Sequence, residues 1–241
     1  MTAVVYGEGL PGPVRRMLGR IVDDLRRGVD MFPEDVVVAV GADDPGLARR
    51  LPPGPRVVVP ALRGHAPSPF AAALLATAAA TVAIDPGEVP GLVRAVHGPL
   101  VVTGVPRLED APAARGVDPG DLGGRMAELW EAEIGPLPAD GPAVCWVGGP
   151  AALAGAVEAW ARGAAVIALP GAHAHAIMRR GGAMLSRTSL EVLEATRLLH
   201  ATRPLQRALA RRGRREAMLL EPIHAVSGRF AEALVLAAEG A

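Results

Sequence analysis

Lysine and asparagine are absent from this chain of 241 residues, so all 25 of its basic side chains are arginines. Without lysine the chain cannot form a Walker A phosphate loop, a Schiff base with pyridoxal phosphate or any other site that needs a catalytic lysine. Without asparagine it has no acceptor for N-glycosylation. These mechanisms are excluded whatever the fold.

Cysteine, aromatic residues and net charge are also scarce. The single cysteine, Cys145, excludes an internal disulfide and a thiolate metal cluster, and its apolar surroundings favour an inert core thiol. Only 3% of the residues are aromatic and 50% are hydrophobic, so alanine, valine and leucine must build the core. A net charge of zero argues against broad binding to nucleic acid or to an anionic membrane. Because no apolar run reaches the ~20 residues of a membrane span, we expect a soluble, cytoplasmic protein with no membrane span.

Short β-branched runs alternate with helical stretches along most of the chain. The runs are continuous and bounded by Gly, Pro or Asp, as in strands that are buried on both faces. Strands are expected at residues 3–6, 36–40, 56–59, 81–84, 100–103, 144–147 and 165–169. Helices are expected at residues 13–28, 69–79, 89–97, 122–134, 151–162, 189–200, 203–218 and 227–238, and Ser189 is the expected N-cap of the helix that it begins. This alternation predicts an α/β fold with parallel sheets.

A proline-rich stretch divides the chain. Six prolines lie from Pro106 to Pro142, around one expected helix, which is typical of a linker or a crossover. We therefore expect two compact Rossmann-like halves, residues 1–108 and residues 143–241 with the terminal helices, joined by a linker at residues 109–142. In a variant of this arrangement the last helix crosses back onto the first half. The alternative fold is one continuous doubly wound sheet.

The first candidate motif is Gly7-Glu8-Gly9-Leu10-Pro11-Gly12, which follows a strand and opens a helix. Its G-x-G-x-x-G spacing is the one that lets a dinucleotide approach backbone N–H groups. Pro11 and Pro13 remove donors that such a cradle would use, and a tight turn in any α/β fold explains the glycines as well. A dinucleotide-dependent enzyme is therefore only the third hypothesis.

The second candidate region is longer and lies in the second half. It comprises residues 143–149 (AVCWVGG), 157–171 (VEAWARGAAVIALPG), 179–185 (RRGGAML) and 190–195 (LEVLEA), followed by the arginine-rich helix. This region resembles the carboxyl-terminal nucleotide-sugar-binding domain of GT-B glycosyltransferases. The resemblance covers roughly the last hundred residues and implies a GT-B-like fold.

The resemblance also implies a function and a set of site residues. It implies a glycosyltransferase that moves a sugar from a nucleotide-diphosphate donor to an acceptor, with the donor as a substrate and with no cofactor or metal. Glu158 matches the family's ribose-binding glutamate, and Gly148 and Gly149 would let the diphosphate approach. Apart from the resemblance, His173 follows the strand expected at residues 165–169, at the edge where α/β folds bind ligands, and its imidazole can act as a base near pH 7, so His173 is the expected catalytic residue. Arg179 would face the phosphates or the sugar.

Two departures from the family pattern keep a second hypothesis open. The position eight residues before Glu158, where many retaining members have another glutamate, is Pro150, and the family's usual lysine on the diphosphate is missing. An arginine fork does not replace an ammonium group directly. The alternative is a catalytically degenerate GT-B-like protein that binds a nucleotide or a partner protein.

Arginines are concentrated in one helix of the second half. Arg203, Arg207 and Arg211 recur at a spacing of four residues and form one stripe, which could contact anions. Because the chain is neutral overall, the sequence favours an ordinary solvated face.

Overall fold

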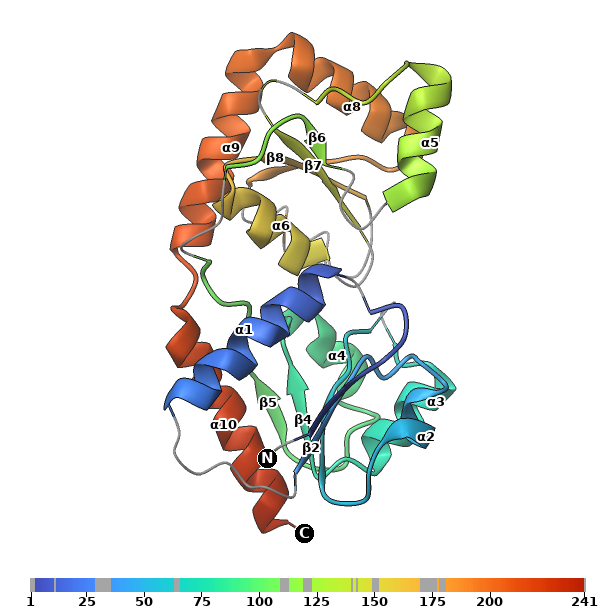
Figure 1. Cartoon of the computed structure of the whole chain (residues 1–241), viewed down its shortest axis with the longest axis vertical. Coiled ribbons are helices and arrows are strands. Elements are labelled where there is room, and N and C mark those ends of the chain that lie inside the picture. The colour runs from blue at the N-terminus through green and yellow to red at the C-terminus, as the bar shows by residue number, and fades with distance from the viewer. Residues whose placement is uncertain are drawn as a thin grey trace. The chain divides into compact units, whose positions relative to one another are not determined.

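A computed structural model describes residues 3–10, 12–28, 36–62, 66–108, 113–118, 123–139, 141, 143–148, 152–169, 177 and 181–240. The chain forms two compact units, one made of Met1–Pro106 with Glu221–Ala241 and the other of Arg107–Leu220. Among the described residues, each unit has its own parallel sheet, of five strands in the first and four in the second (Figure 1). The fold is therefore α/β with two sheets, and the alternative of one continuous sheet is wrong.

The first sheet is built from valine-rich strands in sequence order. Its strands are β1 (Ala3–Tyr6), β2 (Val37–Val40), β3 (Arg56–Val59), β4 (Ala80–Ala83) and β5 (Leu100–Val102), all parallel. The helical elements of this unit are α1 (Gly12–Gly28), α2 (Leu47–Arg50), α3 (Pro69–Ala76), the 3-10 helix η1 (Pro86–Glu88), α4 (Val89–Leu92) and α10 (Ile223–Glu239). The helix expected at residues 89–97 ends early, because Ala95 N–H bonds to the Leu92 carbonyl in a tighter turn.

The alternation of side chains along the strands gives the first sheet two buried faces. On one face, Ala39, Val58 and Ala83 pack with Leu47 of α2 and Leu75 of α3. The other face packs against α10, which contacts β3, β4 and β5 and also runs against α1. Buried residues of α10 recur at helical spacing as Val226, Phe230, Ala233, Leu234 and Ala237. This apolar stripe explains why α10 belongs to the first unit.

The second sheet repeats the same plan with four strands. They are β6 (Val117–Asp118), β7 (Val144–Val147), β8 (Ala165–Ala168) and β9 (Ala183–Leu185), in sequence order and parallel. The described helices of this unit are α5 (Gly123–Glu133), α6 (Ala152–Ala161), α8 (Ser189–Ala201) and α9 (Arg203–Met218). Helices α6 and α9 pack on one another and contact β8.

Two tryptophans fill the other face of this sheet. Trp130 of α5 and Trp146 of β7 lie with their ring centroids 5.9 Å apart, and both are buried. Trp146 Nε1 donates to Thr196 Oγ1 of α8 at 2.9 Å, so the polar atom of this buried ring is satisfied. Cys145, whose side chain alternates to the opposite face, is buried as expected of a core thiol.

The observed domain limits differ from the expected ones in two places. The terminal helix α10 packs in the first unit, which is the variant in which the last helix crosses back. The expected linker at residues 109–142 contains β6 and α5, and both belong to the second unit. Val117 pairs with Val144, and the Trp130 ring packs on Trp146, so strand pairing and burial tie the described part of this proline-rich stretch to the second sheet.

The N-cap of α8 also lies one residue earlier than expected. Thr188, not Ser189, has the extended backbone of a cap, and its Oγ1 accepts the Glu191 N–H at 3.2 Å. The Glu191 carboxylate reaches back to accept the Arg187 N–H at 2.5 Å. This reciprocal pair resembles a capping box, for which Thr188 and Glu191 have the required three-residue spacing.

Candidate functional site

The carboxyl edge of the second sheet brings together three chain segments. Val147, Ala168 and Leu185 are in register across β7, β8 and β9. The segments that follow these strands therefore leave the sheet side by side, beginning with Gly148, Leu169 and Ser186. Ser186 N–H donates to the Ala168 carbonyl at 3.0 Å, which fixes the start of the third segment. Ligands of parallel α/β sheets bind at this kind of edge.

Gly148 lies where β7 passes toward α6. The residue is buried, and Leu169 N–H bonds to the Val147 carbonyl at 2.9 Å directly beside it. The first described turn of α6 begins at Ala152, so the N-terminal end of this helix, where its dipole is positive, lies at the carboxyl edge of the sheet. This edge can therefore attract an anion.

Glu158 lies on α6 between the buried residues Val157 and Ala159, and is itself only partly buried. It comes six residues after Ala152, which places its Cα about 9 Å along the helix from the carboxyl edge. The Cα–Cβ bonds of a helix tilt toward its N-terminus, so the Glu158 side chain starts out on the side of that edge. Its position suits a contact with the outer part of a ligand whose anionic group is at the start of the helix.

The other expected site residues are not placed. Gly149, His173 and Arg179 lie outside the described residues, as does Pro150. Of the expected site, the structure therefore locates Gly148 and Glu158, both on the β7–α6 unit. Among the described residues, no group of three or more His, Cys, Asp and Glu side chains could hold a metal ion.

The glycine motif of the first unit has a structural explanation. A Cβ on Gly7 would lie 2.8 Å from the Gly41 carbonyl oxygen, so this position needs glycine for the close approach of two loops. Gly9 has φ of +69°, in the left-handed region that favours glycine. Gly7 and Gly9 are therefore required by the conformation of the turn after β1.

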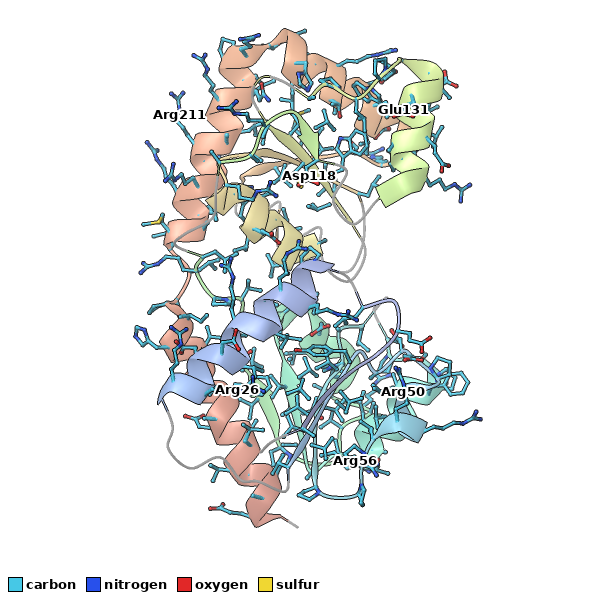
Figure 2. The ribbon with its side chains drawn as sticks, in the orientation of Figure 1. Arg26, Arg50, Arg56, Asp118, Glu131 and Arg211 are labelled. Atoms are coloured by element: carbon cyan, nitrogen blue, oxygen red, sulfur yellow. The ribbon has the colours of Figure 1, made fainter. Side chains whose placement is uncertain are left out.

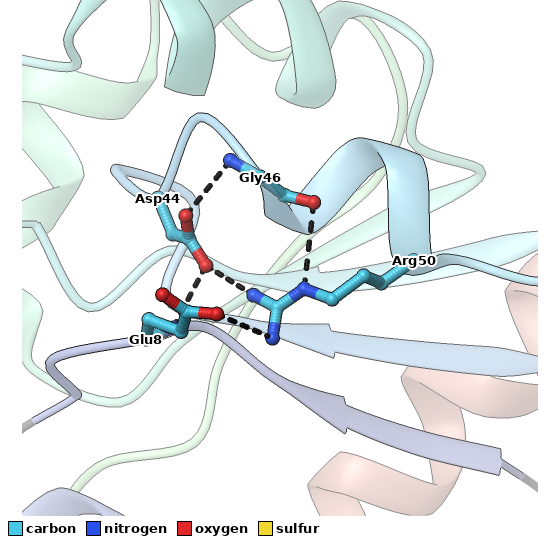
Figure 3. A network of polar contacts seen from close by, with 4 residues as sticks. All are labelled: Glu8, Asp44, Gly46 and Arg50. Atoms are coloured by element: carbon cyan, nitrogen blue, oxygen red, sulfur yellow. Dashed lines mark hydrogen bonds and ion pairs between the residues drawn. The ribbon is translucent and has the colours of Figure 1, made fainter.

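The N–H groups around this turn bind a protein carboxylate (Figure 3). Asp44 Oδ2 accepts the Glu8 N–H at 2.7 Å, and Asp44 Oδ1 accepts the Gly46 N–H at 2.8 Å. Arg50 pairs with the same Asp44 carboxylate and lies 3.6 Å from Glu8 Oε1. A phosphate at this position would be repelled by the carboxylates of Glu8 and Asp44, and Asp44 already accepts the N–H groups of Glu8 and Gly46. The geometry therefore disfavours a dinucleotide here. The sequence signal that was missed is Asp-Pro-Gly at residues 44–46, which is typical of an Asx turn.

Tyr6 closes β1 next to this turn. The Arg15 guanidinium lies 5.4 Å from the centre of the Tyr6 ring, in cation–π geometry. Burial raises the pKa of the Tyr6 hydroxyl, and the positive charge of Arg15 offsets part of that rise. Tyr6 is therefore a neutral packing residue at physiological pH.

Two parallel sheets in two units, with helices packed on each sheet, are the architecture of GT-B glycosyltransferases, and the chain has this fold. It is similar to sucrose-phosphate synthase from Thermosynechococcus elongatus, with a TM-score of 0.57 and 14% identity over 82% of this chain and 72% of that chain. MurG from Acinetobacter baumannii gives a TM-score of 0.46 and 16% identity over 92% and 78% of the two chains. The spinosyn forosaminyltransferase SpnP gives 0.40 and 14% over 83% and 76%.

No protein-family model matches the chain, and no curated protein matches it by sequence. At 14% identity, the likeness to sucrose-phosphate synthase shows the fold and leaves the chemistry to the residues of this chain. Among the described helices, none combines the length and the apolar character needed to cross a bilayer.

Proposed function

We propose that this protein is a glycosyltransferase that takes a sugar from a nucleotide-diphosphate donor. The observation that carries the proposal is the position of Glu158 on α6, the helix that connects β7 to β8 in the second sheet of a GT-B fold. The solved structure with the highest TM-score of those reported above is named as a sucrose-phosphate synthase, which is consistent with sugar transfer.

The described residues suit the nucleotide end of the donor. An ionised Glu158 carboxylate would accept hydrogen bonds from ribose hydroxyls, because both of its oxygens are acceptors and it carries no hydrogen of its own. Gly148 has no side chain to obstruct the diphosphate, and the start of α6 supplies N–H groups and a positive dipole end. The donor would thus lie along α6, with phosphates at the sheet edge and ribose beside Glu158.

The transfer itself would fall to residues outside the described part of the chain. The bond between the anomeric carbon and the diphosphate oxygen would break as an acceptor oxygen bonds to that carbon. In this proposal His173 takes the acceptor proton, Arg179 stabilises the leaving diphosphate, and Gly149 continues the opening at Gly148. The acceptor would be held by the first unit, and neither a metal nor a resident cofactor is required.

A second candidate function is nucleotide or partner-protein binding without transfer. Pro150 stands where many retaining GT-B enzymes have a glutamate, and no lysine is present to hold the diphosphate. Both departures affect the reacting end of the donor and leave the ribose position at Glu158 intact. This candidate therefore predicts nucleotide binding with no turnover.

Thermal unfolding with a ligand panel separates these functions. UDP, GDP, ADP and NAD are added separately to the wild-type protein, to Glu158→Gln and to Glu194→Gln. Glu194, an exposed residue of α8, is the matched control because the same charge is removed from the same unit. A ligand at about a hundredfold its Kd stabilises the folded state by about 2.7 kcal/mol.

The proposed function predicts that one nucleoside diphosphate raises Tm in the wild type and in Glu194→Gln, and does so far less in Glu158→Gln. A shift with NAD that Glu158→Gln retains would overturn the proposal in favour of the first unit's turn. The absence of any shift would remove Glu158 as a ligand residue. Where the shift is seen, release of the nucleoside diphosphate from its sugar conjugates distinguishes an enzyme from a degenerate binder.

A further inference from the structure

The outer face of α9 carries an unusual concentration of positive charge. Six arginines lie within the sixteen residues of this helix, and all six are exposed: Arg203, Arg207, Arg211, Arg212, Arg214 and Arg215. Figure 2 shows Arg211 projecting from the helix away from the sheet. The only acidic residue of α9 is Glu216. Although the whole chain has no net charge, the outer face of α9 is therefore strongly cationic.

Four of these arginines form one continuous stripe. At 100° per residue, Arg203, Arg207, Arg211 and Arg214 fall within about 80° of the helix circumference. The buried residues Gln206, Gly213 and Ala217 define a different face, which packs in the unit. The packing of α9 therefore directs the stripe toward solvent, whichever rotamers the arginine side chains adopt.

No carboxylate within the described part of the chain forms an ion pair with any of these six guanidinium groups. Elsewhere the chain does pair its arginines: Arg50 meets Asp44, Arg162 meets Asp118, and Arg229 meets Glu221. Like charges four residues apart on a helix repel one another, so the bare stripe destabilises the isolated protein slightly. An external anion would relieve that repulsion.

Exposed aliphatic side chains accompany the stripe. Met218 ends α9 on the angular position of the stripe, and Leu219 follows it with 75% of its surface exposed. Clusters of four to eight basic residues on a helix are typical of binding to anionic lipid, and aliphatic side chains beside such a cluster add contacts with the headgroup layer.

We propose that the α9 surface, defined as the four-arginine stripe with Met218 and Leu219, docks on an anionic lipid bilayer. The guanidinium forks would bind lipid phosphates and carboxylates, and the aliphatic side chains would enter the headgroup layer. A convex helix presents no groove or strand edge for a peptide. Residues 189–229 contain no Phe, Tyr or Trp side chain on which bases of a single-stranded nucleic acid could stack.

Docking through the α9 surface is compatible with the zero net charge of the chain. Net charge predicts the absence of broad electrostatic binding, whereas docking through one face needs only local charge, because screening confines the interaction to about 8 Å at physiological ionic strength. The inference concerns a different face of the second unit from the carboxyl edge and does not rest on the proposed function.

Vesicle sedimentation with the full chain tests the proposal. Vesicles of phosphatidylcholine alone are compared with vesicles that also contain phosphatidylserine, at low and physiological salt. The test variant carries Arg203→Gln, Arg207→Gln, Arg211→Gln and Arg214→Gln. The matched control carries the same substitution at Arg20, Arg26, Arg49 and Arg94, exposed arginines of the first unit, and so has the same net charge. Circular dichroism checks that each variant is folded.

We expect binding to the phosphatidylserine vesicles alone, weakened by salt. Each arginine near an anionic surface contributes roughly fivefold in affinity, so the test variant should bind several hundredfold more weakly and the control variant by far less. Replacing Met218 and Leu219 by serine should weaken the binding that remains at physiological salt. Equal loss in both quadruple variants, binding to pure phosphatidylcholine, or retention by polyglutamate or single-stranded DNA but not by vesicles would each overturn the proposal.

Discussion

Arg229 of α10 donates a hydrogen bond to the backbone carbonyl of Thr103, the residue that follows the last strand of the first sheet. The same guanidinium nitrogen pairs with Glu221, at the point where the chain returns from the second unit. Thr103 lies just before the outward passage at Pro106. One side chain therefore holds both of the segments that connect the first unit to the second.

Replacing Arg229 by glutamine should lower the stability of the first unit. A hydrogen bond to a charged group contributes about 1.5–3 kcal/mol, and partial exposure reduces this, so we expect a loss of about 1–2 kcal/mol in urea unfolding. Arg27→Gln is the control, because its partner Asp24 lies 3.7 Å away and the Arg27 side chain is 75% exposed. Similar losses in the two variants would mean that Arg229 is an ordinary surface ion pair.

The packing of α9 on α6 predicts a second effect. A Cβ added at Gly213 would lie 2.1 Å from Trp160 Cδ1, and Trp160 is held in place by its Nε1 hydrogen bond to the Gly182 carbonyl at 2.9 Å. Gly213→Ala should therefore cost about 1–3 kcal/mol through overpacking, despite the better helix propensity of alanine.

Gly228→Ala, in contrast to Gly213→Ala, should raise the free energy of unfolding. Nothing lies within 4 Å of a Cβ at Gly228 of α10, so alanine should stabilise this helix by about 0.5–1 kcal/mol. Both free energies of unfolding can be measured by urea titration followed by circular dichroism. A stabilising Gly213→Ala would contradict the close contact of α9 with Trp160.

The N-cap of α8 can be located by a pair of alanine substitutions. Thr188→Ala removes the oxygen that accepts the Glu191 N–H and should cost about 1 kcal/mol. Ser189→Ala removes a neighbouring hydroxyl that makes no capping bond and should change stability by less than about 0.5 kcal/mol. The reverse order of effects in denaturant unfolding would restore Ser189 as the cap.

His200, near the end of α8, should make stability depend on pH. Burial lowers the pKa of this imidazole below its ordinary value of 6.5, and the positive charge of Arg203 lowers it further. The folded state therefore prefers neutral His200, and the unfolded state takes up the proton first as the pH falls. Stability is complete above about pH 6.5 and is lost as the pH falls from there toward the folded-state pKa.

The measurement is the free energy of unfolding across this pH range for the wild type and for His200→Gln. The variant should lose part of the decline that the wild type shows below pH 6.5. His224→Gln, which removes an exposed histidine from α10, controls for the loss of an imidazole as such. Parallel pH profiles for the wild type and His200→Gln would contradict the prediction.

Strand and helix positions followed closely from the sequence because valine-rich runs between Gly, Pro and Asp have few other stable conformations. The expected strand at residues 144–147 matches β7, and the helix expected at residues 203–218 has the bounds of α9. The place of α10 could not be decided in this way. An amphipathic pattern shows that a helix buries one face, and it does not say which sheet will cover that face.

The candidate site was predictable only in part for a similar reason. Glu158 lies on α6 and Gly148 directly follows β7, so the spacing of regular elements fixes both positions. The role of Asp44 depends on two loops that are distant in sequence and meet after β1 and β2. The N-cap of α8 was off by one residue, because Thr188 and Ser189 both carry a hydroxyl. Only the three-residue spacing to Glu191 distinguishes Thr188 as the cap.

The return of α10 to the first unit has a consequence for biosynthesis. The second unit is one continuous segment, whereas the first is interrupted by it, so a ribosome completes Arg107–Leu220 before it makes the helix that covers β3, β4 and β5. Until then those three strands lack the helix that packs on them in the finished unit. The unit that begins first is therefore finished last, and during that interval it is the part of the chain most exposed to aggregation or to a chaperone.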